Sequence, residues 1–90
     1  MSLVFDEDRI KKTLYRSNHR GCKETDILIG KYANKKIRDF SKAKYILFEE
    51  LLDEDDWDIY NWIVGKSLAP KKYSDLINEI IDFNDASFRP

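Results

Sequence analysis

The sequence has little of what cross-links a chain, spans a membrane or attracts a polyanion. A single cysteine among 90 residues, Cys22, cannot form an internal disulfide framework and is typical of a reducing compartment. No apolar run approaches the ~20 residues that a transmembrane helix requires, so membrane insertion is not expected. Sixteen basic and 17 acidic residues give a formal net charge of −1. That balance argues against nucleic acid as a partner and against a polybasic membrane anchor.

The N-terminal stretch MSLVFDEDRI is acidic. It has neither the apolar core of a secretory signal nor the arginine and serine content of a mitochondrial presequence. We therefore expect a cytoplasmic protein of bacterial origin, or a mitochondrial matrix protein if the chain is a processed eukaryotic form.

The sequence does contain apolar residues at helical spacing. They recur at three- and four-residue steps in five segments, about 6–18, 23–37, 41–53, 56–64 and 72–84, with period 3.6 throughout. The connections are short, which favours antiparallel neighbours. The prediction is an all-α protein, a compact bundle of about five short helices in a single domain over residues 1–90. The expected inward residues are Ile10 and Leu14; Ile27, Leu28, Tyr32 and Ala33; Ala43, Ile46, Leu47, Glu50 and Leu51, with Phe48 and Leu52 beside them; Ile59, Tyr60, Ile63 and Val64; and Tyr73, Leu76, Ile77, Ile80 and Ile81.

Residues that begin or end helices agree with these segments. Ser41 is expected to cap the third helix, and Asp55 or Asp56 the fourth, because a short side-chain oxygen accepts an unpaired N–H there. Gly65 stands where a helix-ending residue with positive φ is expected, and Pro70 precedes the fifth helix.

The acidic stretch LLDEDDWDIYNW suggests a calcium loop, but the pattern fails. Counted from Asp53, the sixth position is Asp58 instead of glycine and the twelfth is Val64 instead of glutamate. No metal site is expected. Trp57 and Trp62 are five residues apart and lie on different sides of a helix, so we expect one in the core and Trp57 as a weak candidate for a partner contact.

His19 and Cys22 are the only histidine and the only cysteine, three residues apart. A metal site would need further ligands, and a catalytic dyad would need an orienting group and an oxyanion hole. The three glycines are isolated and form no phosphate-binding loop. We expect neither an enzyme nor a bound cofactor, and a hydrolase using Cys22 ranks last.

The stretch HRGCKETD, residues 19–26, admits two interpretations. As a helix-to-helix corner, Gly21 ends the first helix, His19 and Arg20 lie near its negative end, and Glu24 and Asp26 lie in the first turn of the next helix. As a binding surface, Gly21 lets the backbone of another protein come close. The residues alone leave both open.

A resemblance favours the second interpretation. RGCKETD, followed by an apolar helix and by WDIYNW, resembles the SdhE family, small assembly factors that promote covalent attachment of FAD to the flavoprotein subunit of succinate dehydrogenase. The resemblance spans about residues 8–84. Cys22 and Thr25 depart from it, because the family pattern has apolar residues there. The matching residues are Arg20, Gly21, Glu24 and Asp26, then Asn61 and Trp62.

The resemblance implies a five-helix fold and a monomeric chaperone whose partner is that flavoprotein subunit. Fumarate reductase is left open as a second client, as is direct contact with FAD. The implied partner-binding residues are first Arg20 and Gly21, then Glu24, Asp26 and His19, with Trp57 from the aromatic pattern. Glu24 and Asp26 would either contact the partner or hold Arg20 in place. The competing hypothesis is a small helical adapter or regulatory subunit unrelated to flavin assembly, with an exposed aromatic patch around Trp57.

Overall fold

Five α-helices and two short 3-10 helices make up the fold in the computed structural model, which describes residues 6–88. In chain order they are α1 (Glu7–Asn18), α2 (Lys23–Lys36), η1 (Ile37–Asp39), α3 (Lys42–Leu52), α4 (Asp56–Val64), η2 (Lys71–Tyr73) and α5 (Ser74–Phe88). The all-α prediction is confirmed. None of the described helices is long and apolar enough to cross a membrane. The first half of the stretch used for the targeting prediction, residues 1–5, lies outside the described residues.

Side-chain caps set most helix starts. Asp6, Ser41 and Asp55 each accept a hydrogen bond from a backbone N–H two or three residues further on, at 2.8, 3.2 and 3.1 Å. Gly65 ends α4 with φ +86°, in the left-handed region that glycine adopts without steric cost. The predicted roles of Ser41, Asp55 and Gly65 are confirmed.

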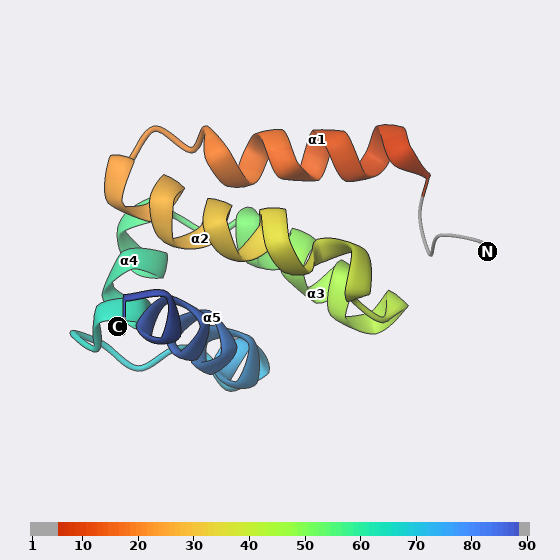
Figure 1. The fold of residues 1–90 in the computed structure, drawn as a ribbon. Helices are drawn as coiled ribbons and strands as arrows, with labels where there is room; N and C mark the ends of the chain where they lie inside the picture. The colour runs from red at the N-terminus through yellow and green to blue at the C-terminus, as the bar shows by residue number, and fades with distance from the viewer. Residues whose placement is uncertain (1–5, 89–90) are drawn as a thin grey trace.

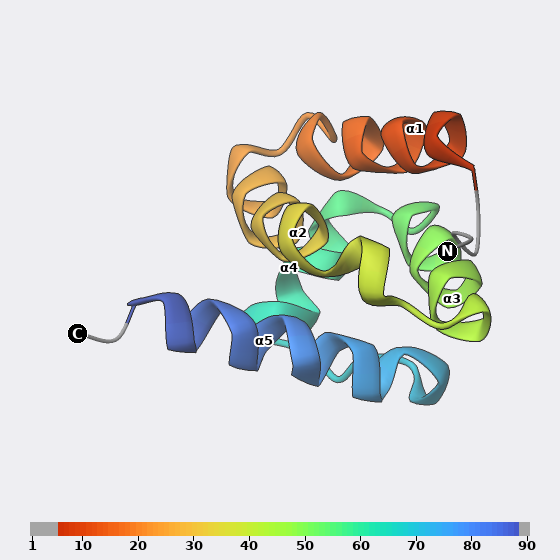
Figure 2. The ribbon, with the colours of Figure 1, turned by 45° about the vertical axis from the view of Figure 1, so that its right-hand side comes forward.

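The α2 helix is central to the molecule. It packs against α1, α4 and α5, and it continues into η1. Figures 1 and 2 show α1 and α5 on opposite sides of α2, with α3 alongside and the short α4 under the end where α1 turns into α2. The α1–α2 corner and the joint between α3 and α4 are therefore at the same end of the bundle.

Aromatic rings fill the middle of the core. The ring of Tyr32 on α2 lies 5.8 Å from that of Phe40, 6.1 Å from that of Phe48 and 5.7 Å from that of Phe83. The buried apolar residues are Ile10, Ile29, Tyr32, Ala33, Ile37, Phe40, Tyr45, Phe48, Leu51, Leu52, Ile59, Ile63, Tyr73, Leu76, Ile77 and Ile80.

The predicted inward face of the third helix was wrong in part: Leu51 is buried and Leu47 is half-buried as expected, but Ala43 is exposed. Tyr45 and Phe48 point into the core, whereas the side chain of Ile46 is 42% exposed and Glu50 faces solvent. The cause is that α3 carries apolar residues on nearly every side, so periodicity alone does not select the buried one. Packing of the aromatic rings around Tyr32 selects it instead.

Two further inward assignments need correction. On α2, Tyr32 and Ala33 are buried as predicted, but Ile29 is buried as well and the expected Ile27 is 43% exposed. On α4 the inward residues are Ile59 and Ile63, while Val64 is 45% exposed at the C-terminal end. The fifth helix begins at Ser74, after the η2 turn, and its buried side is as predicted except that Ile81 is half-buried.

Candidate partner-binding site

The corner between α1 and α2 is a tight, exposed turn. Helix α1 ends at Asn18, and Gly21 follows three residues later with φ +97°. The prediction that Gly21 ends the helix is therefore corrected: this glycine makes the turn itself. A Cβ atom on Gly21 would meet no atom within 4 Å. Glycine is thus favoured here by backbone conformation, and the space above it is open to a partner.

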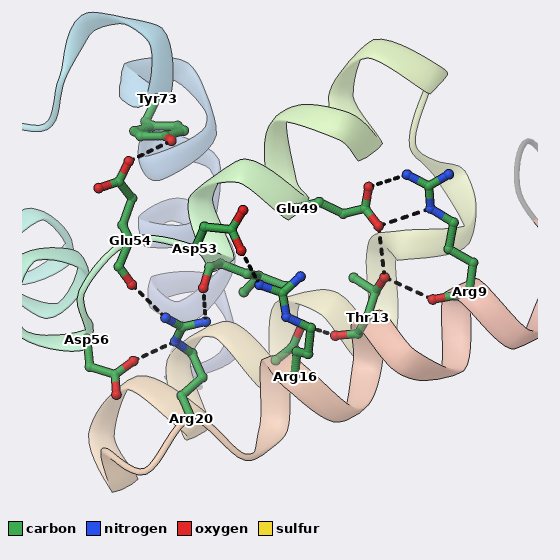
Figure 3. A network of polar contacts seen from close by, with 11 residues as sticks. Arg9, Thr13, Arg16, Arg20, Glu49, Asp53, Glu54, Asp56 and Tyr73 are labelled. Atoms are coloured by element: carbon green, nitrogen blue, oxygen red, sulfur yellow. Dashed lines mark hydrogen bonds and ion pairs between the residues drawn. The ribbon is translucent and has the colours of Figure 1, made fainter.

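Arg20 is directed into its own chain. Its guanidinium donates to the Asp56 carboxylate at 2.6 Å and to the backbone carbonyls of Leu52 and Glu54 at 2.5 and 2.8 Å. The two carbonyls lie at the C-terminus of α3 and in the loop just beyond it. Carbonyls there lack intrahelical partners, and the helix dipole favours a cation. The Arg20 side chain is only 9% exposed. Figure 3 shows the three bonds converging on this one side chain.

Asp26 fixes the Arg20 backbone. Its carboxylate accepts a hydrogen bond from the Arg20 N–H at 2.6 Å, across the turn from the first part of α2. The resemblance leaves two roles open for Asp26, contacting the partner or holding Arg20, and this contact agrees with the second. Arg20 and Asp26 together lock the shape of the corner.

The corner is one end of a row of polar contacts between α1 and α3, which we call the polar seam. Arg9 pairs with Glu49, Thr13 shares a hydrogen bond with Tyr45 at 2.8 Å, and Arg16 pairs with Asp53 at 2.6 Å. The α1 members recur at helical spacing on one side, which Figure 3 shows as successive rungs leading to Arg20.

Beyond the polar seam, hydrogen bonds lead from Arg20 to η2, just before α5. Glu54, whose carbonyl binds Arg20, accepts a hydrogen bond from the Tyr73 hydroxyl at 2.8 Å through its side chain. Burial, and then this hydrogen bond, raises the pKa of Tyr73 above its ordinary value. The corner is therefore connected through the α3–α4 joint to α5.

His19 and Glu24 remain exposed around Gly21. The His19 ring stacks on the Tyr15 ring at 4.4 Å, and the Glu24 carboxylate contacts only the Cys22 thiol, at 3.6 Å, among the described residues. Beside them is an open hollow of about 300 Å³, lined by Arg16, His19, Arg20, Glu54, Asp55 and Asp56. The corner thus presents a small concave surface next to an exposed glycine.

The described residues hold no metal site: no group of three or more His, Cys, Asp or Glu side chains is placed to bind an ion. The Cys22 thiol is directed to Glu24, and no described hydrogen bond joins it to His19.

The two tryptophans differ in exposure as expected, although Trp62 is half-buried against the core instead of within it. Trp57 is 64% exposed and lies edge-on to Tyr60 with ring centroids 5.8 Å apart, whereas Trp62 is half-buried against Tyr73 at 5.9 Å. The carbonyl of Asn61 accepts bonds from the N–H groups of Lys66 and Ser67, which closes the end of α4. Trp62 therefore serves the fold, Asn61 contributes to it through its backbone carbonyl, and Trp57 faces solvent.

Some members of this site had no individual signal in the sequence. The sequence indicates Asp56 only as a possible helix cap, and it gives no signal for Glu54 or Tyr15. Their roles depend on contacts with residues far along the chain or, for Tyr15, on the position of His19. Thr25, a departure from the family pattern, is fully buried, and its hydroxyl has no hydrogen-bond partner among the described residues.

Comparison with known proteins places this geometry in context. A family model described as "Flavinator of succinate dehydrogenase" matches residues 11–84. Succinate dehydrogenase assembly factor 2-B, mitochondrial, of Drosophila mojavensis is 34% identical over 77 residues, covering 83% of this chain and 49% of the relative. Succinate dehydrogenase assembly factor 2, mitochondrial, of Mycosarcoma maydis is 33% identical over 72 residues, covering 80% and 30%. The corresponding protein of Scheffersomyces stipitis is 41% identical over 51 residues, covering 57% and 34%. The chain spans about half the length, or less, of these curated relatives.

Proposed function

Since the chain belongs to the family of flavinators of succinate dehydrogenase, we propose that it is an assembly factor for that enzyme. It binds the flavoprotein subunit and promotes covalent attachment of FAD, without itself being an enzyme. The relatives are named as mitochondrial proteins, which supports the mitochondrial alternative for this chain.

The open turn at Gly21, next to an Arg20 side chain that is fixed by three hydrogen bonds, supports this proposal most directly. Gly21 leaves room for the partner's backbone, and the exposed His19 and Glu24 flank it. Arg20 and Asp26 act as positioning residues, because their polar atoms hold the turn in shape. A preformed turn lowers the conformational entropy lost on binding.

The mechanism is differential binding. A partner shifts a conformational equilibrium only by preferring one of the conformers. The corner would bind the flavoprotein in the conformer in which its FAD is placed for covalent attachment. The covalent step itself then belongs to the flavoprotein, and this chain supplies only binding energy.

The test uses a matched pair of glycine variants. Gly21 and Gly65 have φ of +97° and +86°, and at both positions an added Cβ meets nothing within 4 Å. Gly21→Arg and Gly65→Arg therefore carry a similar backbone strain, about 1–2 kcal/mol, but only the first obstructs the corner. In-gel fluorescence of the denatured flavoprotein subunit reports covalent flavin. Wild type and Gly65→Arg should restore the signal to cells lacking the protein, and Gly21→Arg should not.

Circular dichroism of the purified variants provides the control. Both should remain helical and lose similar thermal stability. If Gly21→Arg alone unfolds, or if both variants abolish flavin attachment equally, the loss reflects strain, and docking at the corner is refuted. If the in-gel flavin fluorescence does not depend on the protein at all, the role in flavin attachment is refuted and the adapter hypothesis is favoured.

A further inference from the structure

The outward side of α4 is unusually apolar for a solvent-facing helix. Trp57 is 64% exposed, Val64 is 45% exposed, and Tyr60 between them is half-buried. Their three- and four-residue steps place them on one side, which we call the α4 outer face (Trp57, Tyr60 and Val64). Ile59 and Ile63 fill the opposite, buried side. A helix that is apolar on both sides is expected to be covered on both.

The α4 outer face is held ready for contact. The backbone N–H of Trp57 donates to the Asp55 carboxylate at 3.1 Å, which caps the helix. The ring of Trp57 rests edge-on against that of Tyr60. The Arg20–Asp56 pair fixes the first turn of α4 to the rest of the molecule. Large aromatic side chains fixed in this way lose little freedom on binding and are frequent anchors of protein interfaces. Leu68, 96% exposed just beyond α4, is a further apolar group on the same stretch of chain.

Charge around this face specifies what can cover it. Between Lys44 and Lys66 the chain has seven acidic residues and no basic one. Four of the seven, Glu49, Asp53, Glu54 and Asp56, are bonded to side chains of α1, the corner or η2.

Asp55 and Asp58, on either side of Trp57 in the sequence, form no ion pair with any described residue. The apolar face is therefore bordered by uncompensated negative charge.

We propose that the α4 outer face binds a segment of the partner protein in which apolar side chains are flanked by lysine or arginine. Complementary charge would select such a segment and speed its association, and the apolar contact with Trp57 would supply most of the affinity. Trp57 and Val64 are two helical turns apart, about 10 Å at 1.5 Å per residue, so the segment covers roughly two turns of helix.

This inference rests on the proposed function for the identity of the partner. It adds to the corner a second surface with different chemistry, because the corner requires close approach to a backbone and the α4 outer face requires a basic apolar segment.

The experiment measures binding to the purified flavoprotein subunit of succinate dehydrogenase. The double variant Trp57→Ser/Val64→Gln should weaken binding at least tenfold. Asp58→Lys should slow association several-fold and reduce its dependence on salt. Ile46→Gln is the matched control, because Ile46 on α3 is 42% exposed, close to the 45% of Val64, but lies outside the α4 outer face; it should bind as wild type.

Two results separate this inference from the proposed function. If Gly21→Arg abolishes binding while the correctly folded double variant binds as wild type, the proposed function stands and the inference is overturned. If the flavoprotein does not bind wild type, the proposed function is refuted. The inference is then tested by measuring the binding of a 14-residue amphipathic peptide of leucine and lysine. Binding of that peptide to wild type but not to the double variant, with no binding of a leucine–glutamate counterpart, supports it. Equal binding to wild type and the double variant overturns it.

Discussion

Removing the Arg20 side chain should destabilise the protein far more than removing its neighbour Arg16. Both arginines bind an aspartate at 2.6 Å, but Arg20 and Asp56 are 9% and 25% exposed, whereas Arg16 and Asp53 are 41% and 73% exposed. The two pairs share the same distance to aspartate but differ in burial and in the two carbonyl bonds that Arg20 adds.

The magnitude follows from what Arg20→Ala leaves behind. Two carbonyl oxygens lose a charged donor, and Asp56 loses its counter-ion in a site that water enters only partly. Breaking a buried ion pair costs about 3–5 kcal/mol. Because Asp56 keeps some contact with solvent, we expect the low end, about 3 kcal/mol. That is a large share of the ~5–13 kcal/mol typical of a 90-residue domain. Arg16→Ala should cost about 0.2–1 kcal/mol, as exposed pairs do.

Urea unfolding followed by circular dichroism measures both values. Arg20→Lys provides an intermediate, because lysine keeps the charge but cannot donate along the three directions that the guanidinium uses. The expected order of stability is wild type, Arg16→Ala, Arg20→Lys, Arg20→Ala. If Arg20→Ala is no less stable than Arg16→Ala, the Arg20 bonds contribute nothing beyond a surface pair, and its role as a positioning residue is refuted.

Three further predictions concern the core and the pH dependence of stability. Thr25→Val should raise stability by about 0.5–1 kcal/mol, measured by thermal unfolding, because it removes a buried hydroxyl without a partner. The pKa of Glu79 lies below its ordinary value, chiefly because Lys44 donates to its carboxylate. The stability from this contact is present above about pH 4.3 and is lost as pH falls through the lower pKa of the folded state. Lys44→Met should make this loss of stability less steep when unfolding is measured at decreasing pH. Burial, and then the bond to Glu79, raises the pKa of Tyr32; stability should therefore hold up to about pH 10 and decline as pH rises further, less steeply in Tyr32→Phe. A wild-type alkaline limb identical to that of Tyr32→Phe would contradict the last of these.

The sequence predicts the helices well because their signals are local. Ser41, Asp55 and Gly65 act through backbone groups within a few residues, so their roles can be recognised without knowing the fold. Helix α3 shows where local signals end. Its apolar residues surround the helix, and only contact with distant rings decides that Phe48 is buried and Ile46 is exposed.

The corner divides in the same way. The motif around Gly21 identifies the turn, and an open site at positive φ agrees with a glycine there. The direction of the Arg20 side chain was not accessible, because its acceptors lie 32 to 36 residues further along the chain. A charged residue beside a binding motif suggests a contact with a partner, and only the fold shows that its hydrogen bonds go to the α3–α4 joint. The partner-binding roles of all six residues stay predictions: His19, Arg20, Gly21, Glu24, Asp26 and Trp57.

The span of the Arg20 bonds also bears on when the corner takes shape. During synthesis, α1 and α2 leave the ribosome well before residues 52–56, which contain the Arg20 acceptors. The turn at Gly21 therefore gains its rigid form only after more than half of the chain has emerged. In the finished protein the turn and the α3–α4 joint should open as one cooperative unit, with matching amide hydrogen-exchange protection on both. A nascent or truncated chain would carry the HRGCKETD motif without the fixed shape of the corner.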